Sequence, residues 1–214
     1  MNTTDRVVAF MPIRLNSQRI ENKSIVEILG RPMFCWSLET LDNVGIETYV
    51  YTNEIDKLKN LIDFSAKNVK FIDRPKYLDL HTTKGIDIYK EFSRQIISDI
   101  YLLAHCTSPF VKLNTYKKLV KSVADGTYDS SCTVQRKQTF CWYGGKKLNF
   151  SVPRPKTQEI EPVFVETSAA YCYRRSVLNK NSRSSEKHCL IESFGVENFD
   201  IDNLEDLEIF NILK

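Results

Sequence analysis

The sequence has no run of 18 apolar residues and no signal-peptide pattern at its start. A membrane-spanning helix needs about 20 consecutive apolar residues, and a secretory signal needs a basic stretch followed by an apolar one. We therefore expect a protein of the cytoplasm that is not inserted in a membrane.

Cysteines with metal-binding spacing are also missing. The six cysteines are scattered along the chain, with no C-x-x-C pair among them. Zinc sites and disulfide frameworks need closer spacing or a secreted chain. Free thiols are expected instead, and Cys35 and Cys172, which lie in apolar runs, are expected to be buried.

The sequence has no large excess of positive or negative charge. It contains 30 lysines and arginines and 27 acidic residues, which leaves a net charge of +3. Nucleic-acid-binding proteins concentrate far more positive charge on one surface. The aromatic residues also lack the clustering of an RNA-stacking surface. The expected partner is thus a small anionic molecule in a locally basic cleft, not a nucleic acid.

Apolar patterns along the chain alternate between two periodicities. Residues 7–11 form a continuous apolar run, which is typical of a strand buried on both faces. Further strands are predicted at 46–51, 69–72, 100–104 and 168–173, and helices at 32–41, 54–64, 84–97, 113–123 and 203–213. This alternation predicts βαβ units and a mainly parallel sheet with right-handed crossovers.

The alternation stops after residue 129. Between 130 and 164 no long helix is indicated, but Gly144-Gly145 separates two strand-like segments, 139–143 and 147–151, as in a β-hairpin. A chain of this length fits one globular domain. We therefore expect a single domain, 1–214, with a β-excursion at about 130–165.

Three cations, Arg14, Arg19 and Lys23, follow the first predicted strand within ten residues. Ligands of open α/β sheets lie beyond the carboxyl ends of the strands, and a triphosphate needs several positive groups around its oxygens. A Walker A motif is absent from the sequence, so this would be a different kind of phosphate-binding loop. The spacing alone equally fits a solvated basic loop.

Two aspartates, Asp200 and Asp202, alternate around Ile201 near the end of the chain. On an extended segment both carboxylates face one side, and paired hard oxygen ligands suit Mg²⁺. The alternative is that Asp202 caps the final helix, a position where aspartate is common.

The segment from Arg14 to Lys23, with Gly30-Arg31-Pro32-Met33 after it, resembles the opening signature of a family of cytidylyltransferases. These enzymes activate ulosonic and nonulosonic acids, and they include the CMP-Kdo and CMP-sialic acid synthetases. Residues 103–110, 162–171 and 199–207 are similar to the Q-P-T-S-P-L, P-V-Y-V-E-N-G-A-I-Y and D-I-D-T-x-x-D-F runs of the family. The resemblance implies a Rossmann-like three-layer α/β/α sandwich, with the excursion as a dimerisation hairpin in a homodimer.

The resemblance also implies a reaction, the transfer of CMP from CTP to a nonulosonic (sialic-like) acid with release of pyrophosphate and with Mg²⁺ as cofactor. The implied catalytic residues are Arg14, Arg19 and Lys23, and the implied CTP-binding residues are Arg14, Ser17, Asn22, Lys23, Thr82 and Thr83. The implied sugar-binding residues are His105, Thr107, Ser108, Arg154, Gln158 and Glu166, and the implied metal ligands are Asp200 and Asp202.

Several positions depart from the family pattern. Gln18 and Glu21 replace a lysine and a proline of the first loop, His105 replaces a glutamine, and Thr167-Ser168 replaces Asn-Gly. The changes at His105 and Thr167-Ser168 predict an acceptor that differs from N-acetylneuraminic acid near its acyl-amino end. Two alternatives stay open: an enzyme for Kdo or another acidic acceptor, and a relative that binds nucleotides without turnover.

Overall fold

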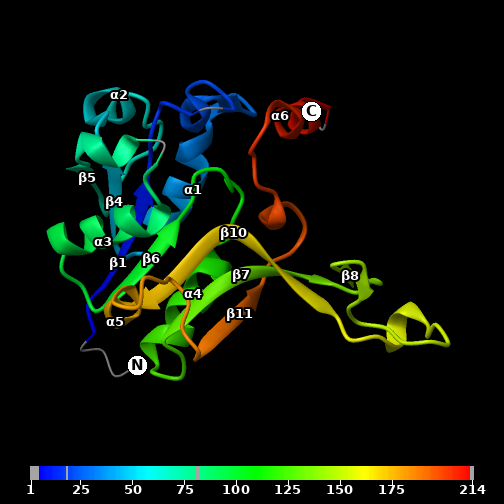
Figure 1. Ribbon diagram of the computed structural model, residues 1–214. Coiled ribbons are helices and arrows are strands. Elements are labelled where there is room, and N and C mark those ends of the chain that lie inside the picture. The colour runs from blue at the N-terminus through cyan, green and yellow to red at the C-terminus, as the bar shows by residue number, and fades with distance from the viewer. Residues whose placement is uncertain (1–4, 18, 81, 213–214) are drawn as a thin grey trace.

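The computed structural model describes residues 5–17, 19–80 and 82–212, so Gln18 lies outside the described residues. Within these ranges the chain forms a seven-stranded sheet with the order β11-β7-β10-β6-β1-β4-β5 (Figure 1). Its strands are β1 (Val7–Pro12), β4 (Glu47–Thr52), β5 (Val69–Asp73), β6 (Ile100–Ala104), β7 (Ser130–Lys137), β10 (Val163–Arg174) and β11 (His188–Glu192). Neighbouring strands are parallel except at β10, which runs antiparallel to both β6 and β7.

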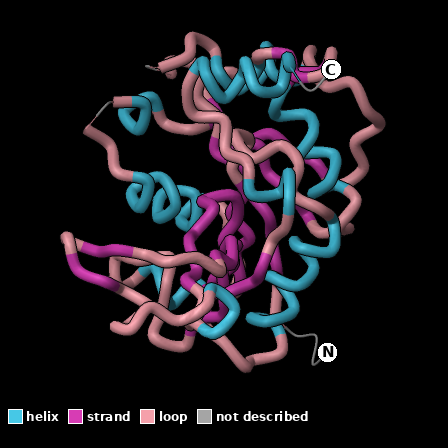
Figure 2. Tube along the Cα trace, turned by 90° about the vertical axis from the view of Figure 1, so that its right-hand side faces the viewer, coloured by secondary structure: helices cyan, strands magenta, loops and turns pink. Residues whose placement is uncertain are grey.

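Helices cover both faces of this sheet. One face carries α1 (Met33–Asp42), α2 (Ile55–Lys59) and α4 (Leu113–Ala124), and the other carries α3 (Gly85–Gln95) and α5 (Arg175–Leu178). Figure 2 shows the strands in the middle with helices on either side. The three-layer α/β/α sandwich with a mainly parallel sheet is thus confirmed.

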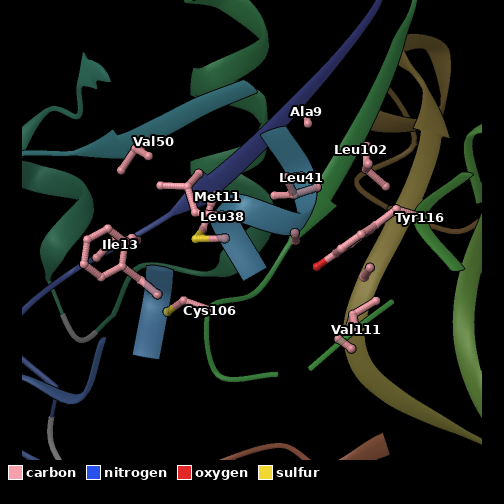
Figure 3. Close-up of a cluster of buried hydrophobic side chains, with 14 of the residues drawn as sticks. Ala9, Met11, Ile13, Leu38, Leu41, Val50, Leu102, Cys106, Val111 and Tyr116 are labelled. Carbon is pink, nitrogen blue, oxygen red and sulfur yellow. The ribbon is translucent and has the colours of Figure 1, made fainter. Parts of the chain in front are cut away.

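The alternation of side chains along β1 explains the two layers of core. Ala9 and Met11 pack with α1 and α4 on one face, as Figure 3 shows for Met11 beside Leu38, whereas Val8 and Phe10 pack on the other. All four are fully buried. A strand with both faces covered by helices must be apolar at every position, which is why the run 7–11 was recognisable.

Most predicted elements occur with small shifts at their ends, but several differ. The helix expected at 54–64 is the shorter α2, and β11, an edge strand beside β7, was not expected. A small hairpin of β2 (Glu27–Ile28) and β3 (Arg31–Pro32) precedes α1. The short 3-10 helices are η1 (Lys23–Ile25), η2 (Lys76–Asp79), η3 (Thr157–Glu159) and η4 (Gly195–Asn198).

The predicted excursion at 130–165 overlaps the central sheet at both ends. Residues 130–137 form β7, and β10 begins at Val163, so the segment that leaves the sheet is 138–162. It carries the expected hairpin, here β8 (Trp142–Tyr143) and β9 (Lys146–Lys147), with positive φ at Gly144 and Gly145. In Figure 1 this arm projects away from the body of the molecule beyond β7 and β10.

The end of the chain returns to the first loop through a small apolar cluster. Ile201 packs with Ile20, Ile28 and Met33, and its backbone N–H donates to the carbonyl of Thr107 (2.8 Å). Helix α6 (Leu204–Ile212) follows. The packing of Ile201 and its hydrogen bond to Thr107 place residues 200–202 at the carboxyl ends of β1 and β6.

The six cysteines are free thiols, and Cys35 and Cys172 are buried as predicted. Across the described ranges, every helix is too short or too polar to cross a bilayer. The cytoplasmic location stays a prediction.

Candidate active site

A cavity of about 360 Å³ opens at the carboxyl ends of β1, β5 and β6. The loop after β1 contributes Arg14, Arg19 and Lys23 to its wall, and Arg74 comes from the segment after β5. Four cations around one cavity make a strong site for a polyanion, because each adds to the field at the same place. The basic loop therefore surrounds a cavity and is not merely solvated.

Asp202 interacts with two of these cations. Its carboxylate accepts from Lys23 Nζ (2.9 Å) and lies 3.3 Å from the Arg19 guanidinium. Burial opposes ionisation of Asp202, but the hydrogen bond and charge of Lys23, together with Arg19, outweigh it and hold the pKa of Asp202 below its ordinary value. The carboxylate is therefore ionised at neutral pH.

The alternative role of Asp202 as a helix cap is not found. Asp206 N–H donates to Asn203 Oδ1 (3.0 Å), and the N–H groups of Asp202 and Asn203 both donate to the Asp206 carboxylate. Asn203 and Asp206 thus form a reciprocal cap on α6. The carboxylate of Asp202 remains directed to the cations of the cavity.

Asp200 lines a second cavity and is linked to the first through Ser108. It accepts a hydrogen bond from the buried hydroxyl of Ser108 (3.3 Å), whose neighbour Thr107 lines the first cavity. The second cavity has a volume of about 400 Å³ and is also lined by Glu166 and Ser168. A group bound at Asp200 would therefore be next to ligands in both cavities.

Arg74 is 1% exposed and is held by an ion pair with Asp79. Asn53 donates to the same carboxylate. Burial of Arg74 lowers its pKa and the charge of Asp79 partly compensates, while its Nε has no hydrogen-bond partner within the described structure. A fixed, incompletely satisfied guanidinium in a cavity wall is suited to a ligand that offers an acceptor.

Both ring nitrogens of His105 have hydrogen-bond partners within the protein. Nδ1 lies 2.6 Å from the carbonyl of Ser168, and Nε2 lies 3.4 Å from the hydroxyl of Tyr89. Burial lowers the pKa of His105, so the neutral ring donates from Nδ1 to the carbonyl and accepts at Nε2. Ser168 has a positive φ of 59°, which is unusual for a residue with a side chain.

Most of the predicted site residues line one of the two cavities or contact a residue that does. The first cavity is lined by Arg14, Ser17, Arg19, Lys23, Thr83, His105 and Thr107, and Glu166 and Asp200 line the second. Ser108 and Asp202 contact the groups described above. Asn22 and Thr82 are close in sequence but are not part of either wall.

Arg154 and Gln158 lie apart from both cavities, on the arm. The guanidinium of Arg154 stacks 3.9 Å from the ring centroid of Phe140 and 5.5 Å from that of Phe150. Within one chain these two residues therefore do not reach the site.

Two residues that line the first cavity, Arg74 and Tyr89, were not among the predicted site residues. The signal for Arg74 was the resemblance of the Arg74-Pro75 stretch to the segment that approaches the cytosine in the cytidylyltransferases. Nothing in the sequence indicated that Tyr89 belongs to the site, because an aromatic residue at helical spacing is typical of the hydrophobic core.

The donor set at Asp200 and Asp202 suits a hard cation. No group of three or more His, Cys, Asp or Glu that could hold a metal occurs in the described chain. Two carboxylates fit Mg²⁺, which keeps waters and takes substrate phosphates as further ligands.

A cation-lined cavity and a carboxylate pair at the carboxyl ends of a mainly parallel sheet define the class of α/β nucleotidyltransferases. A sequence model of the cytidylyltransferases matches residues 8–187, and the chain belongs to this family of CTP-using enzymes. The expected enzyme class is thereby confirmed. No curated protein was found to match the chain.

Solved structures agree on the fold. A CMP:2-keto-3-deoxy-manno-octonic acid synthetase complexed with CTP is 19% identical with a TM-score of 0.67, covering 97% of this chain and 98% of that one. The 4-diphosphocytidyl-2C-methyl-D-erythritol synthase of Anaerococcus prevotii is 12% identical with a TM-score of 0.70, covering 98% and 96%. At these identities the likeness concerns the fold alone.

Proposed function

We propose that the protein transfers CMP from CTP to a nonulosonic (sialic-like) acid and releases pyrophosphate. The observation that carries this proposal is a cation-lined cavity beside a second cavity, with His105 of the first wall hydrogen-bonded to Ser168 of the second. The first has the charge needed for a triphosphate, and the second has room for an acceptor beside it.

The chemistry follows from the charges. An acceptor hydroxyl gives up its proton to water and attacks the α-phosphorus of CTP. A new O–P bond forms, and the bond from the α-phosphorus to the oxygen that bridges to the β-phosphate breaks, which releases pyrophosphate. Arg14, Arg19 and Lys23 stabilise the negative charge that develops on the phosphate oxygens. Mg²⁺, when held by Asp200 and Asp202, supplies further charge neutralisation there.

Nucleotide recognition has a second component at Arg74. Its guanidinium is fixed by Asp79 and lines the cavity, and the Arg74-Pro75 stretch resembles the segment that approaches the cytosine in related enzymes. Thr83 lies on the same wall. These groups support base recognition opposite the phosphate-binding loop.

The identity of the acceptor is the finer part of the proposal. The sialic-like choice is supported by residues 103–110, which resemble the Q-P-T-S-P-L segment of the sialic-acid branch. Kdo or another acidic acceptor is the alternative, and a related structure that is a CMP:2-keto-3-deoxy-manno-octonic acid synthetase favours keeping it.

We also propose a homodimer formed through the arm at 138–162. Trp142, Tyr143 and Val152 are 61%, 79% and 76% exposed there, and apolar side chains gathered on a projecting arm favour a covering partner. A second copy would also offer a route by which Arg154 and Gln158 reach a site.

The test is pyrophosphate release with CTP, Mg²⁺ and a panel of acidic keto-sugars, with each component omitted in turn. Release should require all three and should fall strongly in Lys23→Met. Lys180→Met, which removes an exposed lysine that lines neither cavity, serves as the charge-matched control. A protein that binds CTP but releases no pyrophosphate with any acid would instead be a nucleotide-binding relative without turnover.

A further inference from the structure

Arg74 lies in the wall of the first cavity and is almost fully buried, so the direction of its guanidinium decides what it can bind. It follows β5 directly, its backbone N–H donates to the carbonyl of Thr52 (3.0 Å), and its side chain is 1% exposed. An arginine side chain has many rotamers, and a guanidinium binds well when its planar fork is already oriented. The contacts at the end of this side chain therefore matter for any ligand in the cavity.

Asp79 is the residue that holds the guanidinium. Its Oδ1 accepts from Nη2 of Arg74, and the Asp79 side chain is only 13% exposed. Burial and, less strongly, the nearby charge of Arg14 lower the pKa of Arg74, whereas the charge and hydrogen bond of Asp79 raise it. Asp79 thus compensates a guanidinium that is both buried and close to another cation.

The carboxylate of Asp79 is itself oriented from a second side. Its other oxygen, Oδ2, accepts from the side-chain amide of Asn53, which follows β4. Two donors on two different oxygens fix the plane of the carboxylate, and that plane sets the direction of a guanidinium bound to it. The backbone carbonyl of Asp79 also accepts from the side-chain amide of Asn16 (3.2 Å), in the loop after β1. Asp79 therefore joins the segments that follow β1, β4 and β5.

Asn53 stands behind the first cavity and not in its wall. Together with Asn16 and Asp79 it lines a separate pocket of about 240 Å³. Among the described residues of the first cavity's wall, Arg74 is present and Asn53 and Asp79 are not. A nucleotide in the first cavity would meet Arg74 but neither of these two side chains. Any effect of Asn53 on nucleotide binding must then pass through Asp79 to Arg74.

We propose that Asn53 and Asp79 are positioning residues that hold the Arg74 guanidinium in one orientation for the base of the nucleotide, an inference that rests on the proposed function. A guanidinium only donates hydrogen bonds. Cytosine offers two neighbouring acceptors, N3 and O2, on an edge where uracil has a donor N–H at N3. A guanidinium held in one plane distinguishes these edges, whereas one that can turn discriminates less.

The experiment is calorimetric titration with CTP and with UTP, each with Mg²⁺ and without an acceptor, of the unaltered protein and Asn53→Ala. The Kd for CTP should rise about threefold to tenfold, the size of one lost hydrogen bond. The Kd for UTP should rise less, so that the preference for CTP narrows. The variant should fold, because the pocket beside Asn53 lets water reach the freed oxygen of Asp79, and thermal denaturation of the same samples checks this.

Asn68→Ala is the matched control. The side-chain amide of Asn68 donates to the carbonyl of Asp42 (3.0 Å), and Asn68 precedes β5, at the opposite end of the strand from Arg74. The substitution removes a hydrogen bond of the same kind from a residue that is half-buried like Asn53. It should leave both Kd values unchanged.

A double variant tests whether Asn53 acts through Arg74. Arg74→Lys keeps a positive charge for Asp79 but lacks the planar fork, so it should already weaken the preference for CTP. In this background Asn53→Ala should raise the Kd for CTP by no more than about twofold. Fully additive losses would overturn the inference, because they would mean that the two residues act independently.

Two further outcomes separate this inference from the proposed function. If the unaltered protein prefers CTP and Asn53→Ala keeps the same Kd values, or raises those of CTP and UTP equally, the positioning role is wrong and the proposed function stands. An unaltered protein that binds UTP as well as CTP would overturn both.

Discussion

Asp202→Asn separates a catalytic role from a structural one. The carboxylate accepts from Lys23 (2.9 Å) and faces Arg19 (3.3 Å), and its side chain is 41% exposed. An ion pair this exposed contributes only about 0–1 kcal/mol to stability. Because α6 is capped by Asn203 and Asp206, the variant also loses no cap. The melting temperature should therefore change by at most about 2–4 °C.

The expected effect of Asp202→Asn on catalysis is much larger. Removal of one group that stabilises charge at the reacting centre typically costs about 10²–10³ in kcat, or about 3–4 kcal/mol. If Asp202 holds Mg²⁺ beside the α-phosphate, the loss should reach this range, since an amide removes the negative charge and keeps the shape. The assay is kcat from pyrophosphate release at saturating CTP, with thermal denaturation of the same samples.

Asn203→Ala is the matched control, because it removes the cap and keeps the carboxylate. It should cost about 1 kcal/mol of stability with little change in kcat. If Asp202→Asn kept near-normal kcat, or if Asn203→Ala lost as much activity as Asp202→Asn, the reasoning about Asp202 would be refuted.

Further predictions follow from other parts of the chain. Burial keeps the pKa of His105 below the ordinary 6.5, so the unfolded chain binds a proton that the folded one does not. The free energy of unfolding should fall as pH drops through about 6.5, and His105→Gln should flatten this slope in denaturant titrations; an unchanged slope would contradict the neutral ring. Arg74→Met should destabilise the fold by about 3–5 kcal/mol, because it leaves Asp79 unpaired, and a melting temperature like that of the unaltered protein would be evidence against this pair. Trp142→Ser with Tyr143→Ser should shift light scattering from dimer to monomer, whereas a monomeric unaltered protein near 25 kDa would refute the proposed interface. Across N-acetylneuraminic, legionaminic, pseudaminic and Kdo-type acids, kcat/KM should not be highest for N-acetylneuraminic acid.

The central layers of the fold were predictable because local sequence determines them. Strand β6 and helix α4 have apolar patterns that are complete within their own residues. Strand β11 could not be found this way, since its side chains are partly exposed and its partner β7 lies about 58 residues earlier in the sequence. Strand β7 begins with Ser130-Ser131, small polar residues that are buried only because β10, β11 and α4 surround them.

The site was predictable in part, for a similar reason. Arg14, Lys23 and Asp202 follow or precede elements with clear patterns, and the structure brings them to one cavity. Tyr89 had no signal, because an aromatic residue at helical spacing is typical of the core, and its place in the cavity wall beside His105 depends on tertiary packing.

The most direct test of the proposed reaction is ³¹P NMR of the protein with CTP, Mg²⁺ and an acidic keto-sugar. The account predicts equal amounts of pyrophosphate and of a CMP phosphodiester of the sugar, with neither formed when the acid is left out. Free CMP with pyrophosphate, CDP with phosphate, or unchanged CTP with every acid tested would contradict it.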